Sequence, residues 1–271
     1  ELIKDHRHRL KVYTLALEHL YTEIVLWREA QKEYKNQLAL WGQFKQEFRV
    51  SLSSEEAARV AALLENISSA LEIEKYKLAA SLSDQMTKIY RDWPPRYQQE
   101  LIGRATPSMV EIPSGTFVMG DSNGQGQKDE LPVSKLEIQA FSMSETEITF
   151  AQYDAYLISE AMTLNDDAGW GRGKRPLINV DYASAMAFAE WLSEKTQRNF
   201  DLPSEKQWEY AARANQQSTY AFGDDLTQKA RCEGCDAWGQ TQTTTVKTFP
   251  ANNFGLFDMH GNVWEWVKDC Y

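Results

Sequence analysis

The sequence predicts an α+β protein in which a long N-terminal helical hairpin precedes an irregular domain of short strands and helices. Residues 1–105 place apolar side chains at helical spacing, whereas residues 106–271 hold twelve of the 14 glycines and all three cysteines. The balance of charged residues changes at the same position. Residues 1–105 carry 16 Lys and Arg against 15 Asp and Glu, and residues 106–271 carry 13 against 24. We therefore expect two regions of different architecture, 1–105 and 106–271.

Composition limits the classes of protein to which the chain can belong. Its 271 residues are 42% hydrophobic and carry a formal net charge of -10. This hydrophobic content supports a packed core and argues against wholesale disorder. The negative charge argues against nucleic acid or an anionic membrane surface as the main partner. The sequence contains no run of about 18 apolar residues, so it predicts no membrane span.

Apolar residues in the first region recur at alternating steps of three and four. One such seam runs through residues 10–48 and a second through residues 60–89. This spacing keeps one stripe of a helix facing a partner helix. Hydroxyl and acidic residues at 51–56 supply N-cap candidates, and Pro94-Pro95 ends the second seam. We expect a coiled-coil hairpin that acts as a spacer or oligomerisation stalk, or that packs on the next domain.

The second region has short β-prone runs broken by Gly, Pro and Asn. The expected strands are residues 109–112, 116–119 and 135–138. Two helices are expected, at residues 182–196 and 204–213. In the second helix Ser204 is the N-cap and Gln207 occupies the capping-box position. We expect Tyr210 to be a core residue and Arg213 to be a buried polar anchor.

Five ordered segments of the second region form a recognisable pattern. They are MVEIPSGTFVMG (109–120), SETEITFAQYDAYL (144–157), DLPSEKQWEYAARA (201–214), YAFGDD (220–225) and FPANNFGLFDMHGNVWEWVKDCY (249–271). Together they resemble the formylglycine-generating enzyme family, also called the sulfatase-modifying-factor family. The resemblance covers all of residues 109–271. It implies a large irregular domain with a core related to C-type lectins.

The resemblance implies a family in which activity varies. Its copper-dependent oxidases convert a substrate cysteine to formylglycine with a cysteine pair downstream of the Gly-Asn-x-Trp-Glu-Trp motif. This chain stops at Tyr271, before that block, so we expect a truncated domain without a catalytic residue of its own. Copper is expected only if a downstream cysteine pair exists. The family's iron-dependent sulfoxide synthases use a His-x3-His pair that the first region lacks.

A calcium site is the family feature that falls on matching residues. The resemblance implies that a calcium ion is held by the side chains of Asp258 and Glu265 and by the carbonyls of Gly261 and Val263. Hard oxygen ligands of this kind suit calcium. The alternative is that Glu265 is satisfied by backbone donors without any metal. We expect Trp264 and Trp266 to be buried in the core, and His260 to be a packed, hydrogen-bonded residue.

The three cysteines, Cys232, Cys235 and Cys270, allow several arrangements. Cys232 and Cys235 have the spacing that begins a zinc site, but a closed structural site needs four ligands. A disulfide between these two, or between Cys270 and a further cysteine, is equally allowed. Free buried thiols remain a third possibility.

Three functional hypotheses follow. The first is a domain of the formylglycine-generating family that lacks its active-site block. The second is a non-catalytic, lectin-like module on a helical stalk that binds a protein or peptide. The third is a regulatory fragment produced by proteolytic processing. In each case the N-terminal helices provide a surface for oligomerisation or docking.

Overall fold

The protein is described by a computed structural model that covers residues 21–22, 24–39, 41–42, 54–72, 75–91, 95–122, 124, 126, 128–232 and 242–269. The chain divides into two compact units. The first contains residues 1–98 together with 157–164, and the second contains residues 99–156 and 165–271. The prediction of helices followed by an α+β domain is confirmed. Among the described helices, none has the length and apolar character to cross a membrane.

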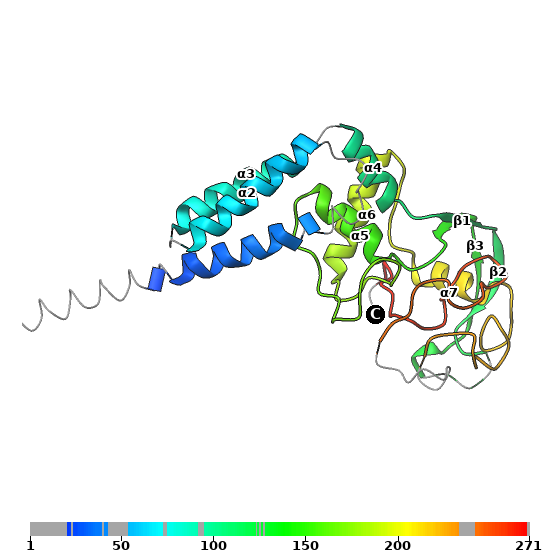
Figure 1. Ribbon diagram of the computed structural model, residues 1–271. Helices are drawn as coiled ribbons and strands as arrows, with labels where there is room; N and C mark the ends of the chain where they lie inside the picture. The colour runs from blue at the N-terminus through cyan, green and yellow to red at the C-terminus, as the bar shows by residue number, and fades with distance from the viewer. Residues whose placement is uncertain are drawn as a thin grey trace, which may run out of the picture. The chain divides into compact units, whose positions relative to one another are not determined.

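Most of the described part of the first unit is helical. A helix covers residues 24–39, and it is followed by α2 (Ser54–Glu72) and α3 (Tyr76–Arg91), which pack against each other (Figure 1). The second seam therefore forms two helices rather than one. After the break, the seam position Leu78 is 47% exposed and the next residue, Ala79, is buried, whereas the later seam position Met86 is fully buried.

The first seam keeps exposed apolar surface. Ile24, Trp27 and Leu38 are each about 40% exposed, whereas Ala30 and Gln37 are buried. The parts of this seam at residues 10–20 and 43–48 lie outside the described residues.

The helix after α3, α4 (Pro95–Ala105), begins with a proline. A proline suits the first turn of a helix, because the amide hydrogen that it lacks would have no helical partner there.

Two pairs of antiparallel strands open the second unit. β1 (Met109–Ile112) pairs with β4 (Phe141–Ser144), and β2 (Gly115–Met119) pairs with β3 (Ser134–Ile138). A short 3-10 helix, η1 (Lys128–Glu130), lies between β2 and β3 in the chain. The three expected strands are confirmed, and β4 is a strand that the sequence pattern did not indicate.

Three further helices follow in the chain. They are α5 (Phe150–Ser159), α6 (Tyr182–Thr196) and α7 (Glu205–Arg213). Ser204 caps α7 in a capping box with Gln207, as expected, so two orphan amides are satisfied reciprocally. The helix α5 was not expected from the sequence pattern.

The core of the second unit forms where α7 meets β2 and β3 (Figure 1). Its buried members are Ile112, Ile138, Met143, Tyr210, Ala211, Ala212, Leu256 and Met259. Tyr210 is 1% exposed, and its hydroxyl donates to the Pro113 carbonyl at 3.1 Å. The Arg213 guanidinium donates to Glu209 at 2.7 Å and to the Gly120 carbonyl at 3.0 Å. The expectation for Tyr210 is confirmed, and Arg213 is a polar anchor that is half-buried rather than buried, with its side chain 19% exposed.

Candidate metal centre

The C-terminal loop, residues 249–269, contains the expected calcium ligands and is held against α7 by Asn252. This residue is 6% exposed, and its Nδ2 donates to the Ala211 carbonyl at 2.8 Å. Its Oδ1 accepts from the amides of Phe254 and Leu256 at 3.0 and 3.1 Å. The side chain supplies partners that an irregular loop lacks, since buried backbone groups must be hydrogen-bonded. It fixes the turn from which the expected ligands follow.

Gly261 is required by the backbone of this loop. Its φ is 139°, a conformation that favours glycine. A Cβ at this position would lie 2.4 Å from the Arg231 carbonyl oxygen, to which the Asn262 amide donates at 2.8 Å. The Gly261 carbonyl accepts from the Val263 amide at 2.8 Å. Because a carbonyl oxygen has two lone pairs, it can still contact a cation.

Asp258 and Glu265 are the two carboxylates of the expected set. Asp258 is 8% exposed, and its Oδ2 accepts from the Lys247 amide at 2.8 Å. Burial raises the pKa of Asp258, although this hydrogen bond favours the charged form. Oε2 of Glu265 accepts from the Trp208 indole at 3.2 Å. Although the Glu265 residue keeps some exposed surface, burial of its carboxyl, aided by the Asp258 charge, raises its pKa to about 7.

Glu147 brings a third carboxyl to the same place. It lies between β4 and α5 and is 8% exposed, and neither of its carboxyl oxygens accepts a hydrogen bond within the described part of the chain. Burial first, then the charges of Asp258 and Glu265, raise its pKa to about 9. The Asn262 amide opposes this rise, but its Nδ2 is directed at the Thr244 carbonyl. Glu147 was not among the site residues expected from the sequence.

Burial raises the pKa values of Glu147, Asp258 and Glu265, and the Asp258 charge adds to the rise for Glu147 and Glu265. Each ionised group is costly in a poorly solvated place, and a divalent ion offsets both the desolvation and the repulsion. Across the described residues, no three His, Cys, Asp or Glu side chains are arranged so that they could hold a metal ion together. A calcium ion here would therefore need backbone carbonyls as well as Asp258 and Glu265. The carbonyls of Gly261 and Val263 are the ligands expected for that role, and the calcium site stays a prediction.

His260 is a packed residue in this loop. Its Nε2 accepts from the Ala221 amide at 3.0 Å, and the ring meets those of Tyr220 and Phe222 edge-on. Burial, together with the Arg213 charge, lowers the pKa of His260 to about 4. The imidazole is therefore neutral near pH 7, and the expectation of a packed, hydrogen-bonded residue is confirmed.

The expectation that Trp264 and Trp266 are buried is wrong. Trp264 is fully exposed, and Trp266 is 48% exposed, with its indole donating to the Val180 carbonyl at 3.1 Å. Residues 264–267 have no helical or strand assignment, and side chains alternate along this stretch. Because Glu265 points inward, its two tryptophan neighbours point outward.

Cys232 is disulfide-bonded in the structure. Cys235 and Cys270 lie outside the described residues. The described part of the chain therefore does not offer the thiolate pair that copper(I) prefers.

Comparison with known proteins relates residues 97–271 to a family model, the sulfatase-modifying factor enzyme 1-like domain. The formylglycine-generating enzyme of Streptomyces coelicolor is 28% identical over 228 residues, which cover 62% of this chain and 70% of that enzyme. The solved structure of PvdO from Pseudomonas aeruginosa matches with a TM-score of 0.58 and 31% identity. That match covers 62% of this chain and 72% of PvdO.

A relative of another kind shares the same region. The serine/threonine-protein kinase pkn1 of Chlamydia pneumoniae is 33% identical over 184 residues, which cover 60% of this chain but 28% of the kinase. The matched domain therefore occurs in proteins with different names and different overall lengths.

Proposed function

Because the chain belongs to the family of sulfatase-modifying factor enzyme 1-like domains, we propose that residues 106–271 form a calcium-binding domain of this family. The ligands are the carboxylates of Asp258 and Glu265 and the carbonyls of Gly261 and Val263. The observation that carries the proposal is Glu147, a buried carboxyl whose oxygens accept no hydrogen bond from the described residues.

Charge supports this assignment. Glu147, Asp258 and Glu265 all have raised pKa values, which means that the folded chain resists ionising them. A calcium ion would remove that resistance, because it prefers six to eight oxygen ligands and carries two positive charges. Glu147 would then supply charge beside the site even where it does not contact the ion.

The test is calcium titration of the EDTA-treated chain, followed by calorimetry and thermal melting. A ligand that binds only the native state stabilises it by about 2.7 kcal/mol at 100 times its Kd, so calcium should raise the Tm. Glu265→Gln should weaken binding, whereas Glu190→Gln, an exposed acid on α6, should bind as the wild type does. If calcium leaves the Tm of the wild type unchanged, the site does not exist.

A second candidate function is oxidation of a cysteine in a polypeptide to formylglycine. The alignment with the Streptomyces coelicolor enzyme over most of that enzyme's length favours it. The test is turnover of a peptide containing Cys-x-Pro-x-Arg by the natural full-length protein, with and without copper and oxygen. Conversion that requires both would support the oxidase, and no conversion would leave the domain non-catalytic.

The alternative is a non-catalytic module that binds a protein or peptide. The relationship to a kinase and the exposed indoles of Trp264 and Trp266 favour it. In this case Trp264→Ala should abolish partner binding without changing the calcium response. Mass spectrometry of the native product distinguishes a processed regulatory fragment from a longer intact polypeptide.

Oligomerisation through the N-terminal helices is a further part of the proposal. The exposed apolar surface of Ile24, Trp27 and Leu38 supports it, because a coiled-coil partner would cover these residues. Sedimentation of residues 1–105 should show concentration-dependent helical dimers. A monomer at all concentrations would contradict a stalk.

A further inference from the structure

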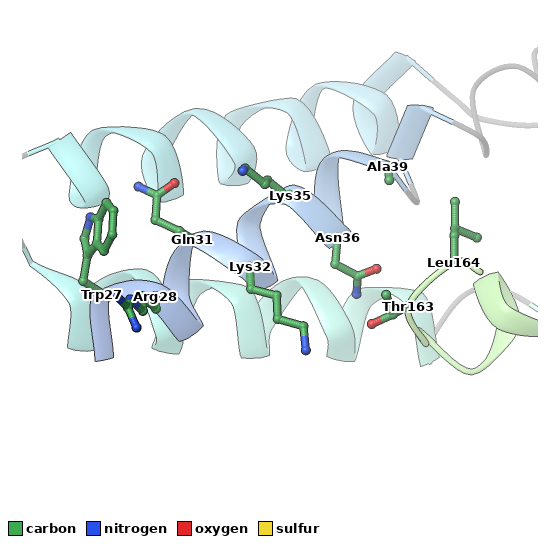
Figure 2. A pocket seen from close by; sticks show the side chains of 9 residues that line it. All are labelled: Trp27, Arg28, Gln31, Lys32, Lys35, Asn36, Ala39, Thr163 and Leu164. Carbon is green, nitrogen blue, oxygen red and sulfur yellow. The ribbon is translucent and has the colours of Figure 1, made fainter. Parts of the chain in front are cut away.

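We propose that the first unit binds a small phosphate ester in a cavity beside the helix of residues 24–39. The cavity has a volume of about 550 Å³, within the range of roughly 300–1,000 Å³ found for small-molecule sites. Its lining residues are Trp27, Arg28, Gln31, Lys32, Lys35, Asn36, Ala39, Thr163 and Leu164 (Figure 2). It lies in a different unit from the candidate metal centre, so the two sites can be tested separately.

The charge of the cavity is positive. Arg28, Lys32 and Lys35 follow one another at spacings that place them on one face of the helix. No acid is among the lining residues, and none of these three cations is in an ion pair among the described residues. Glu33 is engaged elsewhere, because its Oε1 accepts from Gln37 at 2.6 Å. Three uncompensated cations favour a ligand with more than one negative charge.

Asn36 points independently to a ligand. The residue is 8% exposed, lines the cavity, and its Oδ1 has no hydrogen-bond partner among the described residues. Figure 2 shows its amide directed toward Thr163, at the end of the cavity away from Trp27. A buried polar atom without a partner costs about 1–3 kcal/mol. Rotation about the Cβ–Cγ bond would present this oxygen to a donor in the cavity.

A phosphate monoester with free hydroxyls satisfies both features. Its phosphate would accept from the Arg28 guanidinium, which can bind two oxygens at once, and from the Lys32 and Lys35 ammonium groups. A hydroxyl on the same molecule would donate to the Asn36 oxygen.

The experiment is isothermal titration calorimetry of the full chain with ribose 5-phosphate, ribose and inorganic phosphate. The double variant Arg28→Gln/Lys32→Gln should bind ribose 5-phosphate at least about tenfold more weakly, because it loses charge-assisted hydrogen bonds. The matched control is Lys77→Gln/Lys88→Gln, which removes two exposed charges from α3 and should bind as the wild type does.

Asn36→Leu separates recognition from folding. It removes the unpartnered oxygen, so the Tm should not fall, whereas the affinity for ribose 5-phosphate should drop to that for inorganic phosphate. The proposal would be overturned if the wild type did not bind ribose 5-phosphate. It would also be overturned if Lys77→Gln/Lys88→Gln weakened this binding as much as Arg28→Gln/Lys32→Gln does. Equal affinity of the wild type for inorganic phosphate and the ester would also overturn it.

Discussion

Gly261 lies directly against the backbone of Arg231. A Cβ at position 261 would come within 2.4 Å of the Arg231 carbonyl oxygen, and the φ of Gly261 is 139°. The same carbonyl accepts from the Asn262 amide, so it cannot move away without losing that bond. The contact joins the expected calcium turn to the backbone at Arg231.

Gly261→Ala should therefore destabilise the second unit by more than the conformational penalty alone. That penalty is about 1–2 kcal/mol for a left-handed residue, and the collision with Arg231 adds to it. The control is Gly169→Ala, because Gly169 has a φ of 72° and nothing within 4 Å of its added Cβ. Urea unfolding measures both. If both variants lost the same free energy of unfolding, the contact of position 261 with the Arg231 carbonyl would not contribute to stability.

Glu147 should make the calcium-free chain less stable as the pH rises. Its pKa is 4.5 in its ordinary state and about 9 in the folded chain, so between these values the folded state keeps a proton that the unfolded state releases. Stability falls with pH wherever the folded state binds more protons. In EDTA, the free energy of unfolding should therefore decline from about pH 5 to pH 9.

Glu147→Gln should flatten this decline and should exceed the wild type in stability at pH 8. Glu265, whose pKa is also raised, adds to the fall in stability up to about pH 7. The pKa of His260 is lowered from 6.5 to about 4, so His260 makes stability rise with pH between these two values and opposes the fall there. Glu137→Gln, an exposed acid on β3, is the control. An unchanged slope in Glu147→Gln would contradict the assignment of the raised pKa to this residue.

Features that depend on residues close together in the sequence were predictable, whereas features that depend on the packing of distant segments were not. The cap of α7 depends on Ser204 and Gln207, which are three residues apart, so the pattern could be read directly. By contrast, α5 is buried on nearly all sides, with Phe150, Tyr153 and Tyr156 all under 10% exposed. A helix without a polar face has no amphipathic period, which is why the sequence analysis did not indicate it.

The candidate metal centre shows the same difference between residues that are close in the sequence and residues that only the fold brings together. The family pattern placed Asp258 and Glu265 together because they lie in one motif. Glu147 precedes that motif by more than a hundred residues in the chain, and only the fold brings it near. Hydrophobicity alone predicted that Trp264 and Trp266 are buried, but alternation around an inward glutamate places them outside.

Asn252→Ala should be strongly destabilising. The side chain serves the Ala211 carbonyl and the amides of Phe254 and Leu256, so its removal leaves three backbone groups without partners. Each such group costs about 1–3 kcal/mol, and relaxation with water entry recovers part of the loss. We expect a loss of about 2–4 kcal/mol in urea unfolding. Asn253→Ala, at the exposed neighbouring position, should change stability little, and similar losses in both would exclude this role of Asn252.

The ion pair of Asp154 with Arg172 should be costly to break on one side. Asp154 lies on α5 with its side chain 1% exposed, and the Arg172 Nε donates to its Oδ2 at 2.9 Å. The guanidinium also lies 4.4 Å from the centre of the Phe150 ring and donates to the Asn165 carbonyl at 2.7 Å. Removing one partner leaves the other charge poorly solvated.

Asp154→Asn should therefore lower the free energy of unfolding by about 3 kcal/mol or more. The control is Glu194→Gln, which should change the free energy of unfolding by at most about 1 kcal/mol, because Glu194 is 74% exposed. The double variant Asp154→Leu/Arg172→Met removes both charges and should lose less than the two single substitutions together. Urea unfolding of the wild type, the single variants Asp154→Leu and Arg172→Met, and this double variant gives the coupling energy between the two positions. Additive losses would mean that the pair contributes nothing beyond the packing of its separate side chains.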